Sequence, residues 1–313
     1  MLVFIVRRIL GIILTLLTIT TLTFFLMHAI PGDPFTSEQR IPDTVLKNLY
    51  AYYGLDKPLF IQYLQYMKGI FTLDFGPSLK SETREVIDII WDGFPVSARL
   101  GIQAILIAVI FGITLGITLG IIAALKQNGL IDYLSMVLAV IGISVPSFIL
   151  ATLLIHYFAV TWRIFPVASW GSWEHTILPS FALAMTPLAY IARLMRSSVL
   201  EVLEQDYLKT AIAKGVFGKR LILKHVLRNA ILPVITVLGP ISAGILTGSF
   251  VIEQIFGIPG LGKYFVSSIV DRDYPVILGT AVFFSSILVL LVFIVDIAYG
   301  FIDPRIRVTG RKS

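Results

Sequence analysis

Six stretches of this 313-residue chain contain no Asp, Glu, Lys or Arg, and each is long enough to cross the roughly 30 Å of hydrocarbon in a bilayer. With 57% hydrophobic and only 14% charged residues, the chain has too little polar surface to cover a soluble globule. We therefore predict an all-α integral membrane protein with six transmembrane helices. The predicted spans are 9–32, 100–125, 133–162, 175–192, 229–252 and 274–295.

The positive charges predict which side each loop faces. If the N-terminus is inside, the cytoplasmic segments carry 15 Lys and Arg residues and the two short external loops carry 3. Short cytoplasmic loops are enriched in Lys and Arg, so both termini are expected in the cytoplasm. This orientation explains the net charge of +6 without nucleic acid as a partner.

The long segment 31–99 then forms an extracytoplasmic insertion between the first two spans. "DTVLKNLYAYYG" predicts a short helix that ends at Gly54, and "KPLFIQYLQYMKGIF" predicts a second helix that begins after Pro58. Five tyrosines in this region suit a membrane interface. They are Tyr50, Tyr52, Tyr53, Tyr63 and Tyr66. Two interpretations stay open, an interfacial cap on the bundle and a docking surface for an external partner.

Several kinds of catalytic site are missing from the sequence. The chain has no Cys and only four His, none in an H-E-x-x-H motif, so no metal site is expected. "GVFGKR" lacks the upstream Gly and the hydroxyl residue of a phosphate-binding loop. His156 and Asp296 are the ionisable residues placed inside spans, where each either contacts solute or reaches water or a neighbouring helix. The absence of a buried acidic relay argues against a proton-driven carrier.

Prolines and glycines shape the predicted spans. Four prolines are expected to bend or interrupt them, namely Pro146, Pro187, Pro233 and Pro240. Gly112, Gly116 and Gly120 form a G-x-x-x-G repeat on one face of the second span. The repeat fits helix packing within the subunit and a subunit interface equally well.

A basic segment lies between the fourth and fifth spans. Residues 199–214 are expected to continue the fourth span as a helix that ends at Gly215. Beyond this hinge, Arg220, Lys224 and Arg228 share one face of a second helix, and two apolar rows lie beside them. The rows are Ile222, Val226 and Ala230, and Leu223, Leu227 and Ile231. The segment either rests on anionic lipid or presents the small-residue turn "TAIAKG" to a cytoplasmic protein.

At these residues the chain resembles the membrane subunits of bacterial ATP-binding-cassette importers for oligopeptides and dipeptides. The resemblance is carried by "RLMRSSVLEVLEQDYLKTAIAKGVFGKRLILKHVLRNAILP". This stretch is similar to the family's cytoplasmic coupling loop, here 193–230. "FIVRRILGIILTL" with "PGDP", "YGLDKPLFIQY", "EQIFGIPGLGKYFVSSIVDRDYP" and "DPRIR" also resemble the family, specifically its B-type permease.

The resemblance implies two sets of site residues. Those that would couple to an ATPase are Asp206, Tyr207, Thr210, Ala211, Ala213, Lys214 and Gly215. Those in an external loop near the translocation path are Glu253, Phe256, Pro259, Gly260 and Gly262. His225, Arg228, Asn229, Ala230 and Pro233 complete the coupling-loop pattern.

The resemblance also implies the transporter complex to which the chain would belong. It implies one transmembrane permease domain, residues 1–313, of the type I importer fold in the bacterial cytoplasmic (inner) membrane. A homologous second permease would complete the path, two cytoplasmic ATPases would bind and hydrolyse ATP with Mg, and an extracytoplasmic binding protein would deliver peptide. The chain itself would be no enzyme and hold no cofactor. Nickel complexes or glutathione are alternative cargoes, and a secondary carrier or channel is an alternative class.

The chain departs from the family pattern in two places. Lys209, Thr210 and Ala211 stand where the wider superfamily has E-A-A. In "LDFGPS", Leu73 stands where the pattern has Gly, so the shape of that turn is expected to differ.

Overall fold

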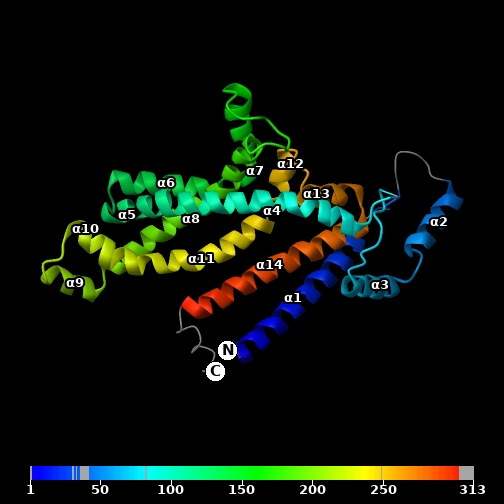
Figure 1. Cartoon of the computed structure of the whole chain (residues 1–313), viewed down its shortest axis with the longest axis horizontal. Helices are drawn as coiled ribbons and strands as arrows, with labels where there is room; N and C mark the ends of the chain where they lie inside the picture. The colour runs from blue at the N-terminus through cyan, green and yellow to red at the C-terminus, as the bar shows by residue number, and fades with distance from the viewer. Residues whose placement is uncertain are drawn as a thin grey trace. The chain divides into compact units, whose positions relative to one another are not determined.

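The computed structural model describes residues 2–29, 32, 34–35, 42–81, 83–247 and 249–302. Within these residues the chain is helical and contains no β-strand, apart from one isolated bridge between Pro77 and Glu85. The predicted all-α membrane fold is confirmed (Figure 1).

The α-helices are α1 (Leu2–Ala29), α2 (Asp43–Tyr53), α3 (Leu59–Thr72), α4 (Val86–Phe111), α5 (Ile117–Leu125), α6 (Leu130–Ser144), α7 (Ser147–Leu154), α8 (Glu174–Leu203), α9 (Asp206–Ala213), α10 (Gly218–Leu221), α11 (Leu227–Thr247), α12 (Phe250–Ile255), α13 (Leu261–Asp271) and α14 (Tyr274–Ile302). Three described segments are π-helical: η1 (Gly112–Gly116) joins α4 to α5, η3 (Ile222–Val226) joins α10 to α11, and η2 (Ile155–Thr161) extends α7.

Among the described residues, five helical stretches are long and apolar enough to cross a membrane, and a bent pair makes a sixth when it is counted as one span. The pair is Leu130–Ser144 with Ser147–Thr161, bent by 100°. The five are Val6–Ala29, Val86–Leu125, Glu174–Leu203, Gly218–Leu246 and Tyr274–Val295. The predicted end of the fifth span at Ile252 is wrong, because α11 ends at Thr247 and α12 begins at Phe250.

The prolines act differently from one another. Pro146 lies at the 100° break and is the residue before α7, as predicted. Pro187 lies inside α8, and Pro233 and Pro240 lie inside α11, so these three do not interrupt their helices, and the alternative that they bend them stays a prediction. Proline removes one backbone hydrogen bond, and tertiary packing around a long helix can hold it together across that gap.

The contacts divide the chain into two compact units, and each is described separately. Unit 1 comprises Met1–Ser97 and Pro259–Phe293, and unit 2 comprises Ala98–Ile258 and Ile294–Ser313.

Helix α8 is the centre of unit 2, where it packs against α5, α6, α7, α11 and η1. The glycine repeat faces it: a Cβ on Gly120 would lie 2.7 Å from the Ala192 carbonyl oxygen and 2.7 Å from the Met195 Cβ. Gly112 and Gly116 face Ile191 in the same way. The repeat therefore serves helix packing within the chain, which is one of its two predicted roles.

Unit 1 contains α1, α2, α3, the start of α4, α13 and α14 as far as Phe293. The rings of Phe24, Tyr63 and Tyr66 pack together where α3 crosses the end of α1. Helix α2 ends at Gly54 in the left-handed conformation (φ 69°), as predicted. Helix α3 ends the same way at Leu73 (φ 58°), so the turn keeps the backbone shape that glycine favours although a leucine occupies it.

Candidate functional site

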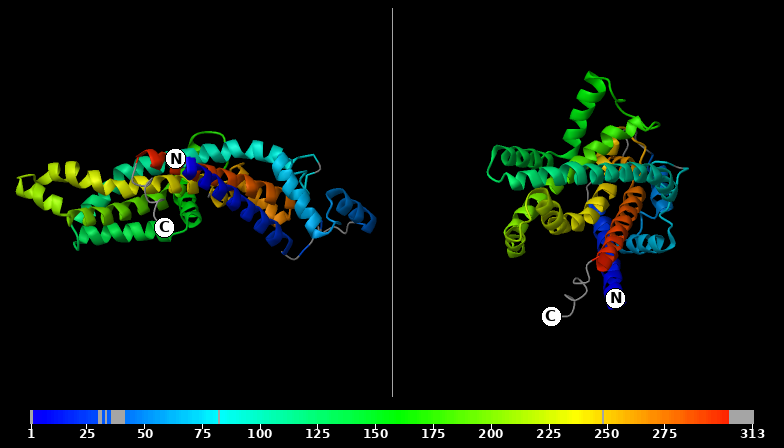
Figure 2. Two further views of the ribbon diagram at one scale, coloured as in Figure 1. Left: turned by 90° about the horizontal axis from the view of Figure 1, so that it is seen from below. Right: turned by 60° about the vertical axis from the view of Figure 1, so that its left-hand side comes forward.

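The predicted coupling loop is a helical hairpin beyond the ends of α8 and α11 in unit 2 (Figures 1 and 2). The expectation of one helix through 199–214 is wrong in detail: α8 ends at Leu203, and α9 begins at Asp206 after an extended Gln205. The break redirects the chain so that Leu208 and Ala211 are buried, which explains why a separate short helix forms here. Asp206 lies in its first turn, where an acid stabilises the helix N-terminus.

Helix α9 ends at the turn predicted around Gly215. Gly215 has φ +85°, a conformation that favours glycine. The Val216 N–H donates to the Ala211 carbonyl at 3.1 Å, and the Gly215 N–H donates to the Ile212 carbonyl at 2.9 Å. These two bonds form a Schellman motif, so the turn is a defined structure rather than a loose loop.

The turn exposes the backbone at Gly215 and the apolar side chain of Phe217. A Cβ on Gly215 would meet nothing within 4 Å. Ala213 and Lys214 are exposed, and the Phe217 side chain is 65% exposed although it is aromatic. An exposed apolar tip with a rigid backbone is suited to a protein contact.

The inner face of α9 is attached to the rest of unit 2 by a hydrophobic cluster. Its buried members come from α5, α8, α9, η3 and α11. They are Ile117, Ala124, Ile191, Met195, Val199, Leu208, Val226, Ala230 and Val234. Because one cluster contacts both arms of the hairpin, α9 is coupled to α8 and α11 at once.

A polar contact reinforces this attachment. The Asn229 Nδ2 donates to the Tyr207 hydroxyl at 2.6 Å, and that hydroxyl donates to the His225 carbonyl at 3.3 Å. Sequence reasoning identified these residues only as motif positions. Their contact joins α9 to the start of α11 across the Gly215 turn.

The other predicted coupling residues lie along α9. Asp206 forms an exposed ion pair with Lys209 at 2.8 Å, and the Thr210 hydroxyl donates to the Asp206 carbonyl at 3.1 Å. Ala211 is buried, whereas Asp206, Tyr207 and Thr210 are exposed. The helix thus has one face packed on the cluster and one face open.

The second arm differs from its predicted pattern. The segment Ile222–Val226 is π-helical, which shifts the residues out of the α-helical spacing on which two apolar rows were assigned. Val226 and Ala230 are buried as the first row predicts, but Leu223 is exposed.

A buried ion pair escaped the sequence reasoning. Arg196 of α8 donates to both carboxylate oxygens of Asp132 in α6, at 2.5 and 2.7 Å, and the Asn128 N–H donates to the same carboxylate at 3.0 Å. Both residues lie just outside the predicted limits of their spans, and this placement is the signal that could have suggested a pairing. The bidentate pair fixes α6 to the helix that leads into the coupling loop.

The predicted external residues fall in both units. In unit 2, Glu253 and Phe256 are buried, the Ser249 hydroxyl donates to the Glu253 carboxylate, and the Phe256 carbonyl accepts from the Ser169 N–H at 2.8 Å. Glu253 is a buried acid that the search for ionisable residues within spans overlooked, because it lies one residue beyond the predicted fifth span. A role near the translocation path stays a prediction for all five external residues.

In unit 1, Pro259 is exposed, and Gly260 caps the N-terminus of α13. Gly260 and Gly262 are buried. The following Leu261 N–H donates to the Ser97 hydroxyl at 2.9 Å. These contacts give the P-G-L-G stretch a structural role inside unit 1.

The structure describes the side chain of one of the two ionisable residues placed within spans. His156 is exposed in η2, with its ring against Tyr157. Asp296 belongs to α14, but its side chain lies outside the described residues.

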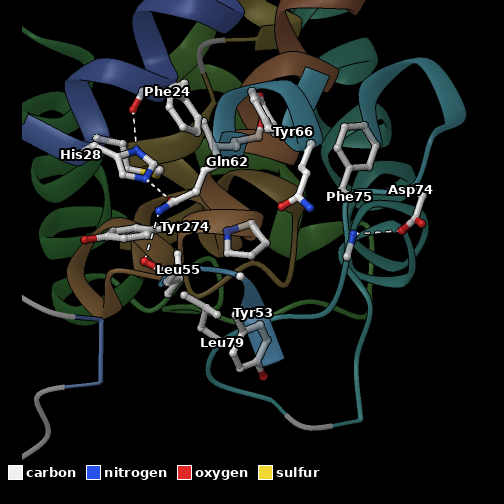
Figure 3. A pocket seen from close by; sticks show the side chains of 16 residues that line it. Phe24, His28, Tyr53, Leu55, Gln62, Tyr66, Asp74, Phe75, Leu79 and Tyr274 are labelled. Atoms are coloured by element: carbon white, nitrogen blue, oxygen red, sulfur yellow. Dashed lines mark hydrogen bonds between the residues drawn. The ribbon is translucent and has the colours of Figure 1, made fainter. Parts of the chain in front are cut away.

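A cavity of about 270 Å³ lies within unit 1, among the ends of α1 and α3 and the start of α14 (Figure 3). Its polar groups bind one another: the His28 Nδ1 is 2.9 Å from the Phe24 carbonyl, and its Nε2 is 3.2 Å from the Gln62 Oε1. The Gln62 Nε2 donates to the Leu55 and Lys57 carbonyls. These bonds tie α3 to α1.

Comparison with known proteins identifies the class first. A chain from the crystal structure of an amino acid ABC transporter with histidines shares the fold, with a TM-score of 0.51 over 67% of this chain and 92% of that chain, at 16% identity. The described helices thus share the fold of this ABC transporter chain.

The sequence comparisons then give the family. The model of the binding-protein-dependent transport system inner membrane component matches residues 116–308, and that of its N-terminal membrane component matches residues 1–101. The chain belongs to this family of inner membrane transport components, as the resemblance predicted. It is a multi-pass inner membrane permease subunit.

Full-length relatives are similar over almost the whole chain. The chain is 57% identical over 304 residues to the dipeptide transport system permease protein DppB of Bacillus subtilis, covering 97% of both. It is 42% identical to the corresponding DppB of Lactococcus lactis, covering 97% of this chain and 99% of that one. It is 44% identical to the oligopeptide transport system permease protein OppB of Escherichia coli K12, covering 98% of this chain and all of that one.

Proposed function

We propose that this chain is the B-type permease of an ATP-driven peptide importer, forming the translocation path together with a homologous second permease. The observation that supports this most strongly is the 57% identity to a dipeptide permease over 97% of both chains. Relatives whose names give dipeptides and oligopeptides both match at full length, so peptides are the proposed cargo.

The exposed turn around Gly215 is the proposed contact with a cytoplasmic ATPase. Its backbone has no side chain covering it at Gly215, and Phe217 offers an apolar surface beside it. Closure of two ATPases on ATP would displace α9. The hydrophobic cluster and the Tyr207–Asn229 contact would carry that displacement into α8 and α11.

In this proposal, the partner ATPases carry out the chemical step, which is ATP hydrolysis. Two ATPases bind ATP and Mg and hydrolyse the nucleotide, and an extracytoplasmic binding protein selects and delivers the peptide. The chain itself contributes the path and the transmission of movement.

Purification tests the assembly. A tagged chain extracted in mild detergent is expected to bring with it P-loop ATPases and a second permease. Reconstituted with the binding protein in liposomes, the complex is expected to take up peptide only with ATP. If the chain purified alone moved peptide without ATP, the importer proposal would be wrong and a self-sufficient carrier would replace it.

The cargo is tested separately. Binding measurements on the partner binding protein should compare dipeptides, longer peptides, glutathione and nickel complexes. Preference for a non-peptide cargo would overturn the peptide assignment and leave the importer assignment intact.

A further inference from the structure

Helix α3 has three distinct faces. Gln62, Tyr63 and Tyr66 face α1 and α14, as their contacts show. Gln65 and Lys68 are exposed on a second, mostly polar face, which also holds Ile61 at 43% exposed. Phe60, Leu64 and Phe71, spaced four and seven residues apart, share a third face, which we call the outer stripe.

The outer stripe is apolar, and its side chains are exposed in the part of the chain that the structure describes. The side chains of Phe60, Leu64 and Phe71 are 67%, 49% and 80% exposed. Three large apolar side chains on one helix face make an exposed patch of the kind that marks a contact with a protein or a membrane.

The packed face places α3 at a defined height beside the first span. The Tyr63 hydroxyl lies 2.8 Å from the Thr21 hydroxyl, and the Gln62 Oε1 lies 3.2 Å from the His28 Nε2. Figure 3 shows His28 and Gln62 facing one another across the two helices. Both α1 residues belong to the membrane-crossing stretch Val6–Ala29.

The geometry of α1 shows how deep in the membrane these contacts lie. At about 1.5 Å per residue, Thr21 lies about 12 Å along the axis from Ala29. A 24-residue helix slightly exceeds the hydrocarbon thickness, so Thr21 lies inside the hydrocarbon and His28 close to its boundary. Helix α3 therefore lies beside the end of the span, at the depth of the lipid headgroups, rather than above it.

Leu73 supplies an independent observation. It ends α3 in the left-handed conformation, which an L-residue adopts at a cost, and its side chain is 67% exposed. In a loop surrounded by water, no contact of the exposed leucine side chain would offset this conformational cost. Contact with lipid would offset the cost, because an apolar side chain gains by leaving water.

We propose that α3 is an interfacial helix whose outer stripe, together with Leu73, inserts into the lipid at the boundary between headgroups and acyl chains. Tyrosines on the packed face hold the helix against α1, and Lys68 and Gln65 face the headgroups and water. The polar and apolar faces match those of helices that lie in the plane of a membrane surface. The proposal depends on the membrane-crossing role of α1 and is independent of the cargo.

The chain has no cysteine, so single cysteines can be introduced without removing any. Phe60→Cys and Phe71→Cys report on the outer stripe, and Gln65→Cys and Lys68→Cys are matched controls on the same helix. Each variant, in the assembled transporter in lipid nanodiscs, would carry a nitroxide label whose relaxation by oxygen and by a water-soluble nickel chelate is measured.

Labels at 60 and 71 are expected to be relaxed more by oxygen than by the chelate, and labels at 65 and 68 the reverse. Equal access of the chelate to all four positions would overturn the proposal. A third result would be that the chelate reaches positions 60 and 71 in the transporter alone and no longer reaches them after the extracytoplasmic binding protein is added. The stripe would then be a protein docking surface, and the lipid assignment would be wrong.

Discussion

The side-chain amide of Asn229 lies 2.6 Å from the hydroxyl of Tyr207, and this hydrogen bond bridges the two arms of the coupling hairpin. Tyr207 belongs to α9, and Asn229 belongs to the first turn of α11. A short helix at the tip is thereby connected directly to a membrane-spanning helix.

We expect Tyr207→Phe and Asn229→Ala to lower ATP-driven peptide uptake by about the same factor. A protein hydrogen bond contributes about 0.5–1.5 kcal/mol net. This corresponds to an effect of roughly two- to tenfold, if the bond is used in coupling. The double variant should be no worse than either single one, which an uptake double-mutant cycle measures. Lys209→Met, which removes an exposed ion pair on the same helix, is the control. Fully additive losses would show that the bond plays no part in transmission.

Gly215→Val is expected to reduce assembly with the ATPase, or stimulation of its activity, while membrane insertion stays normal. A branched residue at φ +85° costs roughly 1 kcal/mol or more locally and adds bulk at the tip. Gly215→Asn is the matched control, because asparagine tolerates this conformation better. Co-purification and ATPase assays give the result. Unchanged transport in Gly215→Val would favour a loop that rests on lipid.

Breaking the pair between Asp132 and Arg196 should destabilise the protein strongly. Removing one partner of a buried ion pair costs about 3–5 kcal/mol, and the partial exposure of Arg196 favours the lower end of that range. We expect Arg196→Gln to lower the thermal transition in detergent clearly. Asp92→Asn, which removes an exposed pair with Arg84, provides the comparison, and an exposed pair contributes less than about 1 kcal/mol. Similar shifts in both variants would contradict the structural importance of the buried pair.

Leu73→Gly is expected to stabilise the detergent-solubilised protein slightly more than Leu73→Ala does. Both variants lose the leucine side chain, but only glycine avoids the penalty of about 1–2 kcal/mol for the left-handed conformation. Glycine also has greater conformational entropy in the unfolded chain, and this offsets about 0.4–1 kcal/mol of the gain in stability. Thermal unfolding of the pair measures the difference. A lower transition for Leu73→Gly would show that the turn is not strained.

Features determined by local chain chemistry could be predicted from the sequence. The turns at Gly54 and Gly215 follow from helix capping, and the break at Pro146 follows from the missing N–H of proline. Apolar stretches without charges were sufficient to find the spans, because the bilayer imposes their length.

Features that depend on distant contacts could not be predicted. Asp132 and Arg196 are 64 residues apart, and no periodic pattern connects them. The π-helical turn at Ile222–Val226 moved Leu223 out of the expected apolar row, and a window of α-helical periodicity cannot detect such a shift. The break before Asp206 arose from burial of Leu208 against residues on four other elements.

The close approach of Gly120 to α8 also bears on which parts of the protein can move. Backbone and Cβ atoms already stand where a side chain would be, so α5 and α8 cannot slide past one another without a steric clash. We expect this helix pair to behave as a single rigid body throughout the transport cycle. Rearrangements that open and close a path must then occur at the borders of this pair.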